Sequence, residues 1–338
     1  MIKYIIKRIL MLIPVLLGIS ILVFLIMRVF SPDPAPIVLG QHATEQETWA
    51  WREANGLNDP IYLQYLNYMK GVFTGDLGTS YFTKTKVTSE IFSRFPATME
   101  LAVAAILFAS IFGIIIGTIS AVKKNSFFDH AGMILALIGV SMPIFWLGIL
   151  LIIVFSGIFQ VLPSGGRMDP LLQPVGGTGF YIIDTLLMRD AEAFLDAIKH
   201  LILPSAALGM YSMAIITRMT RSSMIETLNQ DYIRTARAKG ITEKRVVCHH
   251  ALRNALIPVT TVIGLQFGAL LGGAVLTETV FSWPGIGNYT VQSILKSDFP
   301  VVQGVVLLIA FIFVVINLIV DIIYAFLDPR IKYYRKGE

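Results

Sequence analysis

The sequence predicts an all-α integral membrane protein with six transmembrane helices and with the N and C termini in the cytoplasm. Of the 338 residues, 55% are hydrophobic and only 14% are charged, whereas about a quarter of the residues in an average soluble domain are charged. Six apolar stretches are each about long enough to cross ~30 Å of hydrocarbon as a helix. Lysine and arginine gather in every second loop between these stretches, which is the pattern of a multi-pass membrane protein.

The first helix is expected within residues 1–30, where three cations precede an apolar run over 9–27. This run is longer than the apolar core of a signal peptide, so we interpret it as a retained transmembrane helix. Residues 31–96 are polar and predict an extracytoplasmic loop. The remaining core at 97–328 contains a cytoplasmic loop at 219–256 and apolar spans near 99–122, 133–157, 201–218, 257–280 and 301–327. A cytoplasmic tail follows at 329–338.

The orientation of the helices rests on the charges of the loops. The loop from Arg218 to Arg253 has eight lysines and arginines against three acids, and four more cations follow the last span. The loop at 160–199 has three cations and five acids, and the loop at 281–300 has one of each. Cations concentrate on the cytoplasmic side of membrane proteins. The loop at 219–256 is therefore predicted to lie inside the cell.

This basic loop is predicted to contain two short helices separated by a glycine. Asp231 is a candidate N-cap for the first helix, and Gly240 is a candidate C′ residue because glycine enters the left-handed region cheaply. Thr242 is a candidate N-cap for the second helix, with Ile241 and Val246 as the two members of a hydrophobic staple. Small residues around Gly240 would let another surface approach closely.

The loop also resembles the cytoplasmic coupling loop, the EAA loop, of ABC-importer permeases. In that pattern Glu-Ala-Ala precedes a glycine, whereas this chain has Arg234-Thr235-Ala236 before Gly240. The missing Glu, together with the sequence His250 to Ala255, is typical of the peptide branch of the family. The resemblance implies that the following residues contact an ATPase: Asp231, Tyr232, Arg234, Thr235, Ala236, Arg237, Ala238, Lys239 and Gly240.

The family resemblance covers nearly the whole chain and implies a type I ABC-importer permease fold in the bacterial cytoplasmic (inner) membrane. It implies three kinds of partner besides the lipid bilayer: a second, related permease subunit that forms a heterodimer with this chain, two cytoplasmic ATPases, and an extracytoplasmic peptide-binding protein. ATP and Mg would be used by the ATPases, and this chain would bind no cofactor. The expected substrates are dipeptides or short peptides, with longer oligopeptides, glutathione or nickel complexes as alternatives.

Four further segments resemble the peptide permeases. They are the loop motifs at 52–65 and 75–80, the string Ser141 to Trp146, and the string Thr277 to Gly287. From the residues alone, the two loop motifs are read as turns that carry no chemistry. The family resemblance instead places them in the first extracytoplasmic loop of dipeptide and oligopeptide permeases.

A second group of candidate residues lies inside the apolar spans. Gly264, Gly268 and Gly272 recur every four residues, so they form a small-residue stripe on one helix face. The stripe either contacts a partner subunit and the pathway or packs within this chain. Glu278 and Asp321 are acids at or inside apolar spans, where an acid is costly unless it is paired or faces water. Each is either part of a structural ion pair or part of the pathway.

Other classes of protein are disfavoured by what the sequence contains. Cys248-His249-His250 are consecutive, and consecutive helical residues point about 100° apart, so they do not predict a metal site. The sequence has no phosphate-binding Gly-x-x-x-x-Gly-Lys-Ser/Thr motif and no catalytic motif of a hydrolase, so an enzyme is not expected. A self-powered secondary transporter would show inverted repeats with broken helices, and nucleic acid is not an expected partner.

Overall fold

The computed structural model describes the backbone of residues 2–40 and 42–327, and side chains within 10–40 and 42–319. All regular elements of the described part are helices, and loops connect them; an isolated antiparallel bridge joins Thr79 and Lys86. The chain divides into two compact units. The first unit contains residues 1–98 and 284–314, and the second contains residues 99–283 and 315–338.

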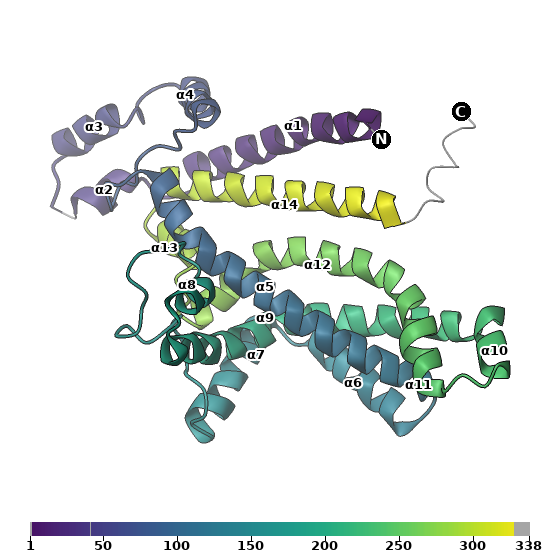
Figure 1. Cartoon of the computed structure of the whole chain (residues 1–338). Coiled ribbons are helices and arrows are strands. Elements are labelled where there is room, and N and C mark those ends of the chain that lie inside the picture. The colour runs from purple at the N-terminus through teal and green to yellow at the C-terminus, as the bar shows by residue number, and fades with distance from the viewer. Residues whose placement is uncertain (1, 41, 328–338) are drawn as a thin grey trace. The chain divides into compact units, whose positions relative to one another are not determined.

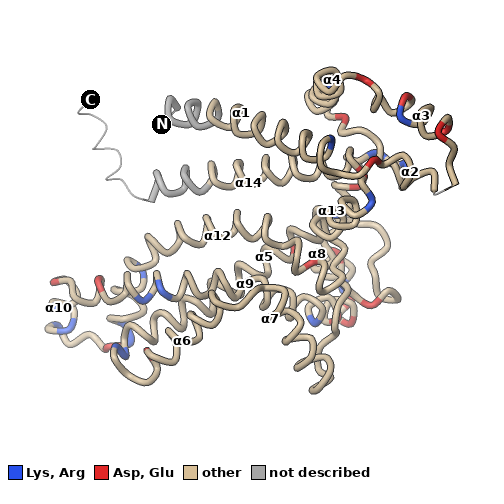
Figure 2. The backbone as a smooth tube through the Cα atoms, turned by 180° about the vertical axis from the view of Figure 1, so that it is seen from behind, with Lys and Arg blue, Asp and Glu red and all other residues tan. Residues whose placement is uncertain are grey.

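The first unit contains α1 (Ile2–Leu25), which ends in a π-helical segment (Ile26–Phe30), and the start of α14 (Phe299–Leu327). These two helices run side by side in both views (Figures 1 and 2). Shorter helices complete the unit: α2 (Pro34–Leu39), α3 (Glu45–Ala54), α4 (Ile61–Thr74) and α13 (Ile286–Leu295). The α3 helix begins with a capping box in which Thr44 and Glu47 bond each other's backbone amides, an arrangement that satisfies two N–H groups at a helix start.

The two loop motifs at 52–65 and 75–80 fold the loop of the first unit. In the first motif, Gln64 donates from Nε2 to the carbonyl oxygens of Leu57 (3.0 Å) and Asp59 (2.7 Å). In the second motif, Ser80 donates from Oγ to the carboxylate of Asp298 at 2.5 Å. Burial raises the pKa of Asp298, while the hydrogen bonds that it accepts act in the opposite direction. The interpretation of the two motifs as simple turns was therefore incomplete, because their side chains also hold the loop together.

The second unit is built around α9 (Ala191–Leu228), which packs against α12 (Leu252–Val280), α6 (Phe127–Ser141) and α7 (Ile144–Leu151). It also holds most of α5 (Val87–Val122) and the short helices α8 (Tyr181–Met188), α10 (Asp231–Ala238) and α11 (Glu243–Arg245). Two π-helical segments, Ile152–Ile158 and Val246–Ala251, extend α7 and join α11 to α12. Figure 2 shows that the charges of this unit gather toward the helix ends.

The described helices match the predicted count of six spans when one bent pair is taken as a single span. Five helices are long and apolar enough to cross a membrane, and α6 with α7 and its π-helical extension forms the sixth candidate. This pair is bent by 110° at Met142-Pro143, where the pattern at 133–157 predicted one continuous span. Proline has no amide hydrogen to donate and its ring disfavours a helical conformation in the preceding residue, so the helix stops there.

Two helices are longer than their predicted spans. Helix α5 begins at Val87 rather than near residue 99, and α9 extends from Ala191 to Leu228 rather than from 201 to 218. An apolar span marks only the part of a helix that needs lipid or a buried environment, and polar turns continue the helix beyond it. The tail at 329–338 lies outside the described residues.

Glycines let α5 approach α9 closely. A Cβ atom on Gly113 would lie 2.8 Å from Cγ2 of Ile216, and one on Gly117 would lie 2.6 Å from the carbonyl oxygen of Thr217. From the other side, a Cβ atom on Gly209 in α9 would lie 2.6 Å from the carbonyl oxygen of Ala105. Only a residue without a Cβ atom fits at such distances, so the helix backbones are held in direct contact.

Candidate functional site

The α10 helix has one buried face and one exposed face. Ile233 is fully buried and Ala236 is 7% exposed, whereas the other residues of Asp231–Ala238 are exposed. The buried pair belongs to a hydrophobic cluster, the α10 core cluster, that also includes residues of α5, α9, the π-helical segment Val246–Ala251 and α12: Ala121, Met224, Val246, Val247, Ala251 and Ala255. Burial of this apolar face anchors a helix that, at eight residues, is too short to be stable alone in water.

The start of α10 differs from the prediction by one residue. Gln230, with φ −73° and ψ 150°, is the N-cap, and Asp231 is the first helical residue. Neither residue makes the side-chain capping bond that was expected of Asp231. The carboxylate of Asp231 instead lies 3.4 Å from the guanidinium of Arg234. A negative charge in the first turn still interacts favourably with the helix dipole.

The end of α10 follows the prediction for Gly240. Gly240 has φ +75°, in the left-handed region that glycine enters without strain. Its amide donates to the carbonyl of Arg237 at 2.9 Å, and the amide of Ile241 donates to the carbonyl of Ala236 at 3.3 Å. These two bonds form a Schellman motif. Ile241 also packs against the α10 core cluster, so the glycine turn directs the chain back onto the protein.

An ion pair joins the two sides of the glycine turn. The guanidinium of Arg237 donates from Nη2 to Oε1 of Glu243 at 2.6 Å and from Nε to Oε2 at 3.1 Å. Hydrogen bonding to Glu243 raises the pKa of Arg237 above its usual value. The pair is exposed to solvent, so its contribution to stability is small. Its geometric effect is to fix the position of α11 relative to α10.

The second short helix begins as predicted but without a side-chain cap. Thr242 is the N-cap of α11, and it makes no capping hydrogen bond. Val246 is fully buried in the α10 core cluster and Ile241 packs against that cluster, consistent with the predicted staple. Tyr232 adds a link to α12, because its hydroxyl accepts from Nδ2 of Asn254 at 2.8 Å.

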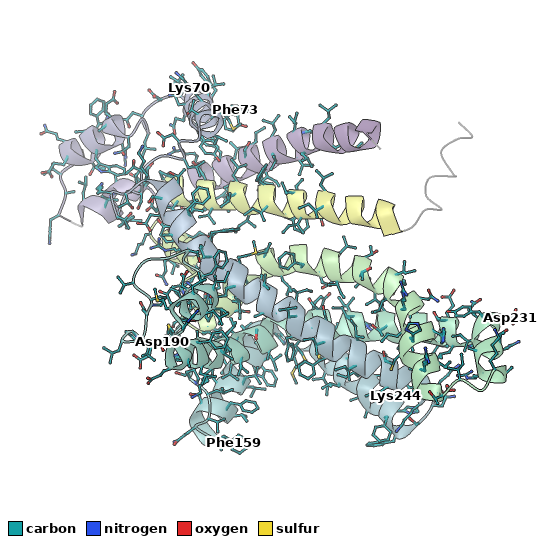
Figure 3. The ribbon with its side chains drawn as sticks, in the orientation of Figure 1. Lys70, Phe73, Phe159, Asp190, Asp231 and Lys244 are labelled. Atoms are coloured by element: carbon teal, nitrogen blue, oxygen red, sulfur yellow. The ribbon has the colours of Figure 1, made fainter. Side chains whose placement is uncertain are left out.

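The resulting surface is compact and mostly cationic. Eight of the nine residues predicted for the coupling loop are exposed, and only Ala236 points into the protein. Figure 3 shows Asp231 and Lys244 at the outer edge of this surface. Arg234, Arg237 and Lys239 supply three positive charges around one acid, Asp231. The buried apolar face holds the exposed face in place.

Comparison with known proteins places the chain in a family. A model described as "Binding-protein-dependent transport system inner membrane component" matches residues 113–333, and a model of the N-terminal region of such components matches residues 1–102. The chain belongs to this family. It is therefore an inner-membrane component of a binding-protein-dependent transport system.

Three curated relatives of this transport component are similar over nearly their full lengths. It is 50% identical over 333 residues to the dipeptide transport system permease protein DppB of Alkalihalophilus pseudofirmus, covering 98% of this chain and 100% of the relative. It is 48% identical over 336 residues to the di/tripeptide transport system permease protein DppB of Pseudomonas aeruginosa, covering 99% and 100%. It is 41% identical over 333 residues to the glutathione transport system permease protein GsiC of Salmonella choleraesuis, covering 98% and 100%.

The three glycines of the predicted stripe, Gly264, Gly268 and Gly272, are not equally buried. Gly268 is buried and Gly264 is half-buried, whereas Gly272 is exposed and a Cβ atom on it would meet nothing within 4 Å. The three glycines of the stripe therefore differ in how far this chain itself covers them. Gly113 and Gly117 of α5, by contrast, are in close contact with α9.

Of the two acidic residues predicted in the apolar spans, Glu278 and Asp321, only Glu278 has a described side chain. Glu278 is fully buried at the end of α12. Asp321 lies in α14, but its side chain falls outside the described residues.

The sequence Cys248-His249-His250 lies in a π-helical segment. Within the described residues, no group of three or more His, Cys, Asp or Glu side chains is placed to hold a metal ion.

Two ion pairs of the second unit were missed by sequence reasoning. Arg221 of α9 donates to both carboxylate oxygens of Asp129 in α6, at 2.6 and 2.8 Å, near the α10 end of the unit. Arg167 donates to Glu100 of α5 from Nε at 2.9 Å and from Nη2 at 2.6 Å, and both residues are buried. The partners of the first pair are 92 residues apart. A charged residue beside an apolar span was the only sequence signal.

Arg167 also fixes the loop that carries it. Its Nη2 donates to the carbonyl oxygen of Gly179 at 2.7 Å, and its guanidinium lies 3.8 Å from the ring centroid of Tyr181. The amide of the neighbouring Gly166 donates to the carbonyl of Phe281 at 2.8 Å. The sequence Ser164-Gly165-Gly166-Arg167 is therefore a structural turn.

Proposed function

We propose that this chain is the permease subunit of an ATP-driven ABC importer and forms half of the translocation pathway for dipeptides. The observation that carries the substrate class is the similarity to dipeptide and di/tripeptide permeases at 48–50% identity over the full chain. The family membership supports the transport role itself. The second candidate function is the import of glutathione or of longer peptides. The relative at 41% identity, a glutathione permease, supports glutathione.

The proposed partners complete the importer. A second, related permease subunit supplies the other half of the pathway, and a heterodimer is the proposed arrangement. Two cytoplasmic ATPases bind ATP and Mg, and an extracytoplasmic binding protein delivers the peptide. The sequence of this chain has no phosphate-binding loop motif of its own, which supports the assignment of ATP hydrolysis to the partners. No cofactor bound by this chain is needed in this scheme.

The exposed face of α10 is the proposed contact with an ATPase. It is held by the α10 core cluster and by the Schellman turn at Gly240, so a force applied to it reaches α9 and α12 rather than deforming a loop. Closure of the ATPases around ATP would move α10 and switch the permease pair from an inward-open to an outward-open state. ATP can shift this equilibrium only through different contact energies in the two states.

Reconstitution tests the proposal directly. The complete complex in proteoliposomes should accumulate a radiolabelled dipeptide only with internal ATP, the ATPases and the binding protein present. Excess unlabelled dipeptide should compete for uptake and glutathione should compete weakly. Uptake without the ATPases would contradict the importer assignment, and stronger competition by glutathione would favour the second candidate.

A further inference from the structure

The first unit contains a polar cavity of about 350 Å³ where the C-terminal end of α1, the helix α4 and the N-terminal end of α14 meet. Both loop motifs line it: Gly56 and Gln64 come from the first, and Asp76 and Gly78 come from the second. The motifs that fold the loop therefore also build a cavity. A volume in this range is typical of a small-molecule site.

The side chains around this cavity have polar atoms without partners. Among the described residues, nothing hydrogen-bonds Nε of Arg28, the hydroxyl of Tyr68, Nε2 of Gln303 or Oε1 of Gln64. Gln303 is 3% exposed and Gln64 is 8% exposed, so water does not replace those partners from the bulk. Burial raises the pKa of Tyr68 to about 12, which keeps its hydroxyl a donor at neutral pH. Buried polar groups without partners are costly and point to a missing ligand or water.

An apolar groove of about 320 Å³ continues from the polar cavity along the same three helices. Its lining includes Leu17 of α1, Val72 and Phe73 of α4, and Leu307 and Phe311 of α14. Leu77 lines both spaces, and the cavity residue Gln303 is followed directly by the groove residue Gly304. Figure 3 shows Phe73 beside Lys70 on the outer side of α4. The two spaces therefore form one site with a polar end and an apolar end.

The polar end lies nearer the end of each membrane span, and the apolar end lies nearer its middle. On α14, the candidate span covers Phe299–Ile319, with Gln303 near its start and Phe311 near its middle. On α1, the candidate span covers Leu10–Phe30, with Arg28 near its end and Leu17 near its middle. A membrane phospholipid has the same order of polarity, with its charged headgroup at the interface and its acyl chains toward the centre.

The charges at the polar end are also complementary to one kind of headgroup. Arg28 supplies a guanidinium, which is well suited to bind a phosphate. Asp76 supplies a carboxylate on the same cavity wall, and a carboxylate would repel an anionic headgroup but attract an ammonium group. A zwitterionic headgroup satisfies both charges.

We infer that this composite site holds one phospholipid of the phosphatidylethanolamine class. Its phosphate accepts hydrogen bonds from Arg28, Tyr68 and Gln303, and its ammonium group faces Asp76. One acyl chain lies in the groove between α1, α4 and α14. The lipid joins the loop helix α4 to the two membrane helices, and the inference is independent of the transported substrate.

Photocrosslinking of the full-length chain, purified with its co-purifying subunits, tests this inference. The complex is placed in phosphatidylcholine nanodiscs that contain phosphatidylethanolamine with a diazirine on one acyl chain. We expect crosslinks at the groove segments of α4 and α14. Arg28→Gln should lower the crosslink yield by about tenfold, because a hydrogen bond to a charged group is lost. Arg28→Lys keeps the charge and should retain more of the yield.

Two further variants, each with its control, test the apolar end and the polar end of the site independently. Leu307→Trp fills the groove and should lower the yield, whereas Phe313→Trp, at an exposed position of α14 outside the lining, should not. Lys86→Gln removes an exposed cation of the same unit and should have no effect. Asp76→Asn should lower the yield of the phosphatidylethanolamine probe but not that of a matching phosphatidylglycerol probe.

The inference is overturned by any of three results. Crosslinks could spread evenly around α1 and α14, they could appear on a partner subunit in place of the groove, or Arg28→Gln and Leu307→Trp could give the same yield as their controls. If Arg28→Gln does not accumulate in the membrane, the comparison of Leu307→Trp with Phe313→Trp decides between the remaining outcomes.

Discussion

At the scale of single residues, Gly240 combines a backbone requirement with an exposed position. Its φ of +75° disfavours any residue with a Cβ atom, yet a Cβ atom placed there would meet nothing within 4 Å. Substitution therefore adds strain of roughly 1–2 kcal/mol in the turn without a clash in this chain. Any larger effect must come from what approaches the turn from outside.

The difference between backbone strain and steric effects on a partner gives a prediction for two substitutions of Gly240. Gly240→Asp should leave membrane insertion and abundance near normal but weaken ATPase association or abolish ATP-driven uptake, because it adds bulk and a negative charge to the docking surface. Gly240→Ala adds strain with little bulk and should be milder. Co-purification of the ATPases and peptide uptake in energised vesicles measure both effects. Full uptake with Gly240→Asp would contradict the coupling role of this loop.

A second prediction at this scale concerns the buried pair of Glu100 and Arg167. Arg167→Ala leaves a buried carboxylate without its main partner, which costs roughly 3–5 kcal/mol. We expect a lower unfolding temperature of the purified complex. The double variant Glu100→Gln with Arg167→Met removes both charges and should recover a large part of that loss. Equal stability of Arg167→Ala and the native protein would show that the pair does not stabilise the fold.

At the scale of helices, the sequence was informative about spans and caps and uninformative about bends and contacts. The apolar stretches located the membrane helices, and the pattern around Gly240 predicted the turn because glycine in a left-handed conformation is a local property. The 110° bend at Met142-Pro143 was missed, since membrane helices often tolerate proline with only a kink. The pair of Asp129 and Arg221 joins helices 92 residues apart, and no local pattern encodes such a contact.

The contact between α5 and α9 gives a prediction with a matched control. Gly117→Leu places a side chain where a Cβ atom alone would lie 2.6 Å from the backbone of Thr217, so the two helices must separate. Gly272→Leu adds the same side chain at a glycine with open space around it. We expect low recovery of folded protein for Gly117→Leu and near-normal recovery for Gly272→Leu, measured by size-exclusion chromatography. Similar recovery of both variants would refute the packing role of Gly117.

At the scale of the whole molecule, the orientation in the membrane is a prediction from loop charges. Cys248 is exposed, so it must first be replaced to give a background without cysteine. Single cysteines at Lys124 and Arg237 should then react only with a reagent on the cytoplasmic side. Cysteines at Lys86 and Asp190 should react from the opposite side. Labelling of position 237 from outside intact cells would overturn both the orientation and the proposed ATPase contact.

The close fit of α5 and α9 also determines how motion passes through the second unit. Because glycines on both helices admit the backbone of the neighbour, sliding of one helix along the other would force backbone atoms together. Helix α9 therefore links α10, which follows one of its ends, to Met168 of the loop after α7, which packs against Ala193 and Ala197 at the other end. A 38-residue helix is about 57 Å long, so a tilt of roughly 5° moves its far end by about 5 Å. A tilt of this size would carry Met168, and with it the neighbouring Arg167, along with the far end of α9.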